Sequence, residues 1–164
     1  MKKGFTIAEL TVVIGILSII ILVVAQPITN IIKYQRESQQ SDNVRDNLQF
    51  ILNVIDKELR TSSDLRIDAS TGTLTFIDQE GAGVVYKKDG NIIRKSVDNG
   101  VFYIAYTDSS VFTVEDLSFF IKAGDGGSVN NNSPGTIVTV VITAKSVDDK
   151  DIVTMQSTTM PRNN

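Results

Sequence analysis

Cysteine and histidine are both absent from the 164 residues of the chain. Their absence excludes disulfides, thiolate nucleophiles, cysteine–histidine zinc sites and any mechanism in which histidine is the general base. The nucleophile motif G-x-S-x-G is also missing. We therefore expect a protein that is not an enzyme and that holds neither a metal nor a cofactor.

The chain also lacks a surplus of positive charge, because 16 basic residues stand against 19 acidic ones. Nucleic-acid binding takes much of its affinity from neutralised phosphates, so this balance argues against nucleic acid as a general partner. One predicted hairpin around Asp89–Gly90 does concentrate cations. These are Lys87, Lys88, Arg94 and Lys95. They form either a local basic patch or, more simply, a solvated hairpin.

Charge is almost missing from the first long apolar segment, which runs from Phe5 to Ala25 and contains only Glu9. At about 1.5 Å per residue it spans about 32 Å as a helix, which is enough to cross the hydrocarbon core of a bilayer. Lys2 and Lys3 precede it and favour a cytoplasmic N-terminus. We therefore expect residues 5–25 to be the transmembrane helix of a single-pass membrane protein.

Two simpler interpretations of this segment stay open. One is an ordinary secretory signal, cleaved before Gln26, although the apolar run exceeds the usual length of about 7–15 residues. The other is a plain membrane anchor for an extracytoplasmic domain. Glu9 has a simple explanation of its own, since Thr6 and Glu9 match the capping box of a helix start.

The stretch KKGFTIAEL, followed by an unbroken apolar run, resembles the class III signal peptide of type IV prepilins and type II secretion pseudopilins. The shared features are a short basic leader ending in Gly4, an aromatic residue at Phe5, and Glu9. The resemblance implies that residues 1–4 are a leader, that prepilin peptidase cleaves between Gly4 and Phe5, and that it methylates the new amine of Phe5. It also implies that Glu9 pairs with the amine of Phe5 of a neighbouring subunit.

The same resemblance implies a function and a location. The chain would be a structural subunit of a type IV pilus or type II secretion pseudopilus. It would lie in the inner membrane, among lipid, until it is extracted into an extracytoplasmic or cell-surface filament. Its partners would be other pilin or pseudopilin subunits, the prepilin peptidase and the inner-membrane assembly machinery. A DNA-uptake or adhesive pilin, whose head binds DNA or a surface, is the alternative.

Helical periodicity continues past the membrane-length segment. Pro27 predicts a kink there, and the resemblance implies that the helix melts locally between Gly15 and Pro27 on assembly. Residues 26–62 are predicted to be an amphipathic continuation, ending near Thr61–Asp64. Its apolar stripe, which we expect in the core, consists of Val44, Leu48, Ile51, Leu52, Ile55 and Leu59.

Two details of this helix carry further expectations. Asp56 and Arg60 lie one turn apart, so we expect them to form an ion pair. The letters IDKELR before a short polar break are similar to J-type minor pseudopilins and related minor pilins. That similarity favours a minor subunit over a major one.

Beyond the helix, short β-branched and aromatic runs alternate with turn residues. The predicted strands are 73–78, 83–88, 91–96, 101–107, 117–123, 136–145 and 151–158. We expect them to form an antiparallel sheet against which the helix packs, giving an α+β fold. The head in residues 63–164 then resembles that of a pilin. Asp148, Asp149 and Asp151 lack the calcium-loop pattern, so a polar turn is the default there.

Overall fold

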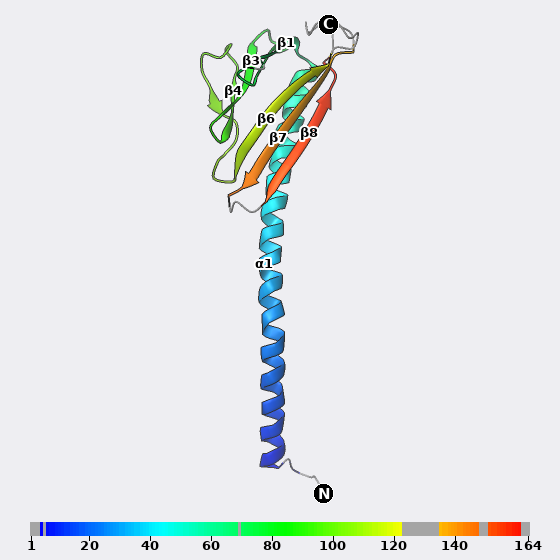
Figure 1. Ribbon diagram of the computed structural model, residues 1–164, viewed down its shortest axis with the longest axis vertical. Coiled ribbons are helices and arrows are strands. Elements are labelled where there is room, and N and C mark those ends of the chain that lie inside the picture. The colour runs from blue at the N-terminus through cyan, green and yellow to red at the C-terminus, as the bar shows by residue number, and fades with distance from the viewer. Residues whose placement is uncertain (1–3, 5, 69, 123–134, 148–150, 162–164) are drawn as a thin grey trace. The chain divides into compact units, whose positions relative to one another are not determined.

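The computed structural model describes residues 4, 6–68, 70–122, 135–147 and 151–161. Within them the chain forms one long helix, α1 (Ile7–Arg60), followed by antiparallel strands (Figure 1). This is the α+β fold that the sequence predicts. The chain divides into two compact units, Met1–Gln40 and Ser41–Asn164, so the last turns of α1 belong to the same unit as the strands.

Among the residues of the first unit that the structure describes, all from Ile7 onward are helical, and their described side chains have no core to enter. Helical backbone bonds satisfy the polar groups of the main chain internally, which leaves apolar side chains to face outward. From Leu10 to Ile32 the large apolar side chains are exposed. Helix α1 continues through Pro27 without interruption.

In the second unit α1 presents its apolar stripe to the strands. All six residues of the predicted stripe are buried, and five of them have no more than 1% of their surface exposed. The helix ends at Arg60, where Ser62 Oγ donates to the Leu59 carbonyl (2.8 Å) and Thr61 Oγ1 to the Glu58 carbonyl (3.2 Å). These hydroxyls satisfy carbonyls that the last turn leaves without helical partners.

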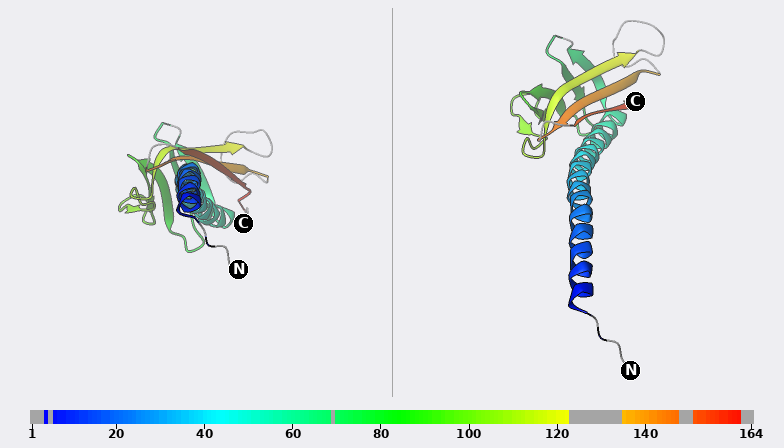
Figure 2. Two further views of the ribbon diagram at one scale, coloured as in Figure 1. Left: turned by 90° about the horizontal axis from the view of Figure 1, so that it is seen from below. Right: turned by 60° about the horizontal axis from the view of Figure 1, so that its bottom comes forward.

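The strands form two antiparallel sheets instead of the one that we expected. The first follows chain order: β1 (Ser63–Asp68), β2 (Thr73–Ile77), β3 (Gly83–Asp89), β4 (Ile92–Ser96) and β5 (Ile104–Ala105). The second contains β6 (Phe112–Lys122), β7 (Ile137–Ser146) and β8 (Ile152–Thr159), also in chain order. Figure 2 shows these two sheets from two further sides.

Three strand predictions differ from the structure, each for a local reason. Strand β1 was missed because its sequence, SDLRID, is half charged and only Leu65 is buried. The strand expected over 101–107 shrinks to the two residues of β5, since Asp98 holds the preceding segment in a turn through bonds from the amides of Val101 and Phe102. Strand β6 begins at Phe112 and not at Leu117, and it contains a bulge between Val114 and Asp116.

The hairpin predicted around Asp89–Gly90 is present. Asp89 pairs with Ile92, and Gly90 between them has φ of +59°. A two-residue hairpin turn requires positive φ at its first central position, which glycine adopts at little cost. This turn sets the register of β3 against β4 and so fixes which side chains face α1.

The core lies between α1 and both sheets. Strand β7 alternates strictly, so that Val138, Val140, Ile142 and Ala144 all point into the core. The first sheet contributes its largest buried side chains, Phe76 and Tyr86, whose rings stack with centroids 6.2 Å apart. The stripe of α1 is therefore the surface that both sheets share.

We predict that Leu52→Ala lowers the free energy of unfolding of the second unit by about 2–5 kcal/mol, because it opens a cavity at a site that is only 1% exposed. Urea unfolding of the full chain in detergent, followed by circular dichroism of the strands, measures the loss. The matched control is Phe50→Ala on the same helix, at a side chain that is 66% exposed. Equal losses for the two variants would contradict the placement of the core.

Candidate functional site

The first turn of α1 is held by a capping box. The backbone amide of Thr6 donates to Glu9 Oε2 (2.9 Å), and the Glu9 amide donates back to Thr6 Oγ1 (3.3 Å). The Thr6 hydroxyl also donates to Glu9 Oε2 (3.0 Å). These reciprocal bonds satisfy amides at the helix start, as the sequence pattern indicates. One oxygen of Glu9 therefore fixes the first turn of the helix.

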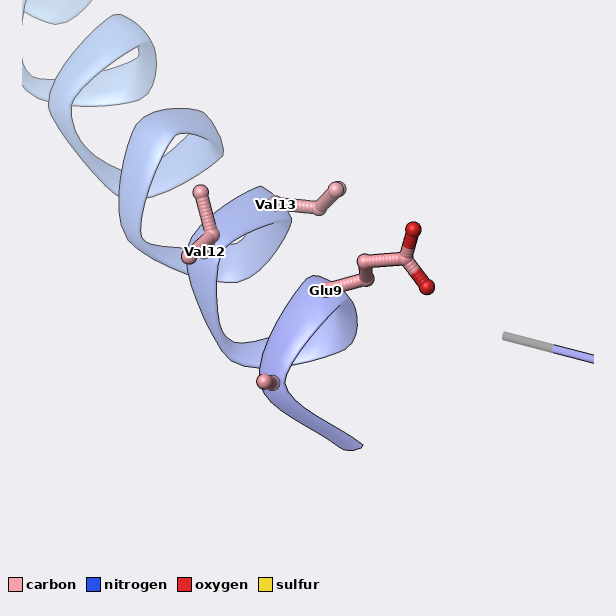
Figure 3. Close-up of a pocket in the computed structure, with 4 residues that line it drawn as sticks. Glu9, Val12 and Val13 are labelled. Atoms are coloured by element: carbon pink, nitrogen blue, oxygen red, sulfur yellow. The ribbon is translucent and has the colours of Figure 1, made fainter. Parts of the chain in front are cut away.

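The other carboxylate oxygen of Glu9 makes no hydrogen bond to the described residues. Figure 3 shows the carboxylate extending away from the helix, on the side to which Val13 also extends. The shallow hollow around it is lined only by Ala8, Glu9, Val12 and Val13, all from one helix. It is thus an open flank and not an enclosed cavity. A free oxygen of a charged group on an apolar flank is suited to accept a cation from outside the chain.

Apolar residues continue along the helix beyond Glu9. An 18-residue stretch of α1 has a mean hydropathy of 2.9, and none of it is buried within the protein. By length and composition this stretch can cross a membrane. Gly15 lies within the segment, and a methyl group added at its Cα would meet nothing within 4 Å beyond its chain neighbours and the nearby backbone of its own helix.

The residues expected at the processing site are only partly described. Gly4 precedes the helix and is exposed. Phe5, with its expected cleavage, methylation and charge pair, lies outside the described residues, as do Lys2 and Lys3. Asp148 and Asp149 of the acidic turn also lie outside them. Within the residues that the structure does describe, no three acidic side chains gather as a metal ion would require.

The cations of the β3–β4 hairpin do not form one open patch. Arg94 Nε lies 2.6 Å from Asp89 Oδ2, and Lys87 Nζ lies 3.8 Å from the centre of the Tyr103 ring. The Lys95 side chain is only 14% exposed and points toward α1. Three of the four cations are therefore engaged with neighbours, which favours the interpretation as a solvated hairpin over a nucleic-acid site.

Glu58 joins α1 to the first sheet, and sequence reasoning missed it. Its Oε1 lies 2.5 Å from Lys95 Nζ, and its Oε2 accepts a hydrogen bond from the Tyr86 hydroxyl (2.8 Å). Burial, and then the negative charge of Glu58, raise the pKa of both Tyr86 and Tyr106 above the usual value, so the phenols stay protonated. The only sequence signal was an acid next to Leu59 of the apolar stripe.

The predicted ion pair between Asp56 and Arg60 is wrong. Asp56 Oδ2 instead accepts a hydrogen bond from the hydroxyl of Ser157, and Arg60 Nε donates to Thr159 Oγ1 (3.4 Å). Both side chains turn to β8 because packing against a sheet gives them partners that an isolated helix would not. Helix α1 thus has polar contacts with both sheets, through Glu58 on one side and through Asp56 and Arg60 on the other.

Comparison of the chain with protein-family models, curated proteins and solved structures finds no match. The candidate site is therefore inferred from the residues of this chain alone. These are an apolar helical stretch of membrane length, with a capping box at its start and a single acid whose second oxygen is free among the described residues.

We predict that Glu58 and Lys95 are energetically coupled. Their side chains are only 24% and 14% exposed, so removing one charge leaves the other without a partner in a place that water reaches poorly. In a double-mutant cycle of Glu58→Gln and Lys95→Met, followed by urea unfolding, we expect a coupling of about 0.5–3 kcal/mol. The matched control is the exposed pair Asp64–Arg66. A coupling no larger than that of the control would contradict the role given to Glu58.

Proposed function

We propose that the chain is a structural subunit, and a minor one, of a type IV pilus or type II secretion pseudopilus. Prepilin peptidase removes residues 1–4 and methylates Phe5, and α1 then packs into a filament. The observation that carries the proposal is Glu9, the one acid in an otherwise uncharged membrane-length segment, with a carboxylate oxygen left over after capping.

The second carboxylate oxygen of Glu9 is available to pair with a positive charge. A carboxylate in the hydrocarbon region is unfavourable without a partner, and the cost grows toward the bilayer centre to about 2.5–3.5 kcal/mol on insertion scales. The capping box supplies hydrogen bonds but no opposite charge. The amine that cleavage creates on Phe5 of a neighbouring subunit would supply one, and the attraction between the two charges is strong where water is excluded. Capping and pairing use different oxygens, so one does not prevent the other.

The apolar flank of α1 supports assembly through the same segment. Its side chains are exposed in the single chain, so they face lipid before assembly and can face other helices afterwards. Gly15 has open space around it, and small residues allow helices in a membrane to approach closely. Packing of one copy on the next in a head-to-tail manner builds an open filament.

The alternatives are less well supported. A DNA-uptake pilin would need accessible cations, but Arg94, Lys95 and Lys87 are engaged within the head. A plain membrane anchor would leave the second oxygen of Glu9 without a purpose. The preference for a minor subunit depends on the IDKELR similarity alone.

Three variants separate the charge of Glu9 from its capping role. Glu9→Gln keeps an acceptor for the Thr6 amide but removes the charge, and Thr6→Val removes the hydroxyl of the cap but keeps the charge. We predict that Glu9→Gln and Glu9→Val are inserted and cleaved normally but are depleted from filaments by about ten-fold or more, whereas Thr6→Val assembles. The measurement is the amount of each variant in sheared filaments relative to the membrane fraction of the native host.

Two results would count against this account. Normal incorporation of Glu9→Gln would show that the charge is not needed for assembly. Loss of incorporation in Thr6→Val, with Glu9→Gln unaffected, would show that Glu9 acts only as a helix cap.

A further inference from the structure

Strand β8 is an open edge of the second sheet. The amide of Ser146 donates to the Asp151 carbonyl (3.0 Å), and this pair fixes which residues of β8 bond to β7. Because hydrogen-bonded pairs alternate along an antiparallel ladder, Val153, Met155, Ser157 and Thr159 point their backbone groups to β7. The amides and carbonyls of the residues between them point the other way. These residues are Ile152, Thr154, Gln156 and Thr158.

The other sheet edges, among the described strands, carry the usual protections against pairing. Strand β5 has only two residues, and β1 contains an irregularity at Ser63–Arg66 with the Asp64–Arg66 ion pair beside it. Strand β6 has a bulge with acidic residues, and its Val114 amide already bonds to the Asn91 carbonyl (2.8 Å). Strand β8 has eight residues in unbroken register, with no proline and no charged side chain.

The margin between β8 and α1 has an arginine toward each end, and the carboxylate of Asp56 between them is bonded to Ser157. A shallow cleft there is lined by Arg45 of α1 and by Ile152, Val153, Thr154 and Met155 of β8. Arg45 is exposed and makes no ion pair with the described residues. Arg60 lies at the other end of the strand, where it contacts Thr159. An arginine therefore stands near each end of an uncharged edge.

We propose that the β8 edge binds an extended, acidic segment of a partner protein, which adds to the second sheet as a further strand. Backbone hydrogen bonds to the outward amides and carbonyls would supply affinity, and carboxylates near Arg45 and Arg60 would set the register. A second copy of this chain fits less well, because its β8 contains no carboxylate of its own. The proposal goes beyond filament assembly and does not depend on it.

The test measures fluorescence anisotropy with the full chain in detergent micelles. The probe is a labelled, acetylated peptide amide of the sequence Glu-Thr-Val-Thr-Val-Thr-Val-Glu, matched in length to β8. We expect it to bind about ten-fold more tightly than the same peptide with lysine in place of both glutamates. We expect no binding by a version with N-methylated amides at alternate residues, because it cannot complete a ladder.

Two variants of the chain locate the site. Gln156→Pro removes an amide that points away from β7, so it should abolish binding while the sheet remains folded by circular dichroism. Arg45→Glu should remove most of the preference, because only Arg60 would remain to attract a carboxylate and the new glutamate would repel one. Lys57→Glu, an equal change of charge on an exposed side chain outside the cleft, should change neither affinity.

Four results would overturn the proposal. The first is the absence of binding at peptide concentrations up to about 1 mM. The second is unchanged binding by Gln156→Pro, and the third is an unchanged preference in Arg45→Glu. The fourth is self-association of the chain that Gln156→Pro abolishes, since this would identify a second copy as the occupant of the edge.

Discussion

One helix must meet the demands of two different environments, and the rest of the structure follows from that constraint. In its first part α1 has apolar side chains on every face and no core to receive them, which is the composition that a membrane accepts. From Val44 to Leu59 the buried apolar side chains lie on one stripe, and that stripe forms the core with two sheets. Glu9 is the one charged residue of the apolar segment from Phe5 to Ala25.

Polar contacts on either side of the apolar stripe restrict how α1 can rotate against the sheets. Glu58 binds the first sheet through Lys95 and Tyr86, while Asp56 reaches β8 of the second sheet. Apolar packing alone would tolerate small rotations of the helix, because it has little directional preference. Hydrogen bonds to two sheets from opposite sides of the stripe restrict that freedom. The last part of the helix therefore has a defined orientation against the two sheets.

The sequence predicts those features that depend on local patterns. The apolar stripe, the capping box of Thr6 and Glu9, the hairpin at Gly90 and most strands follow from spacing and turn chemistry that neighbours in the chain determine. The division into two sheets, strand β1 and the contacts of Glu58 and Asp56 depend on residues distant in sequence. The Asp56–Arg60 prediction failed for this reason, because the helix-surface rule that suggested it assumes that no sheet competes for either side chain.

The central claim is that the N-terminal segment is processed and used for assembly, and the intact mass of the mature chain tests it most directly. The chain should be isolated from its native host, or from cells that also express a prepilin peptidase. The account predicts a chain that begins at Phe5 and is heavier by one methyl group than the unmodified cleavage product. A chain that begins at Gln26 would contradict it and indicate an ordinary secreted protein, and a chain that still begins at Met1 would indicate a simple membrane anchor.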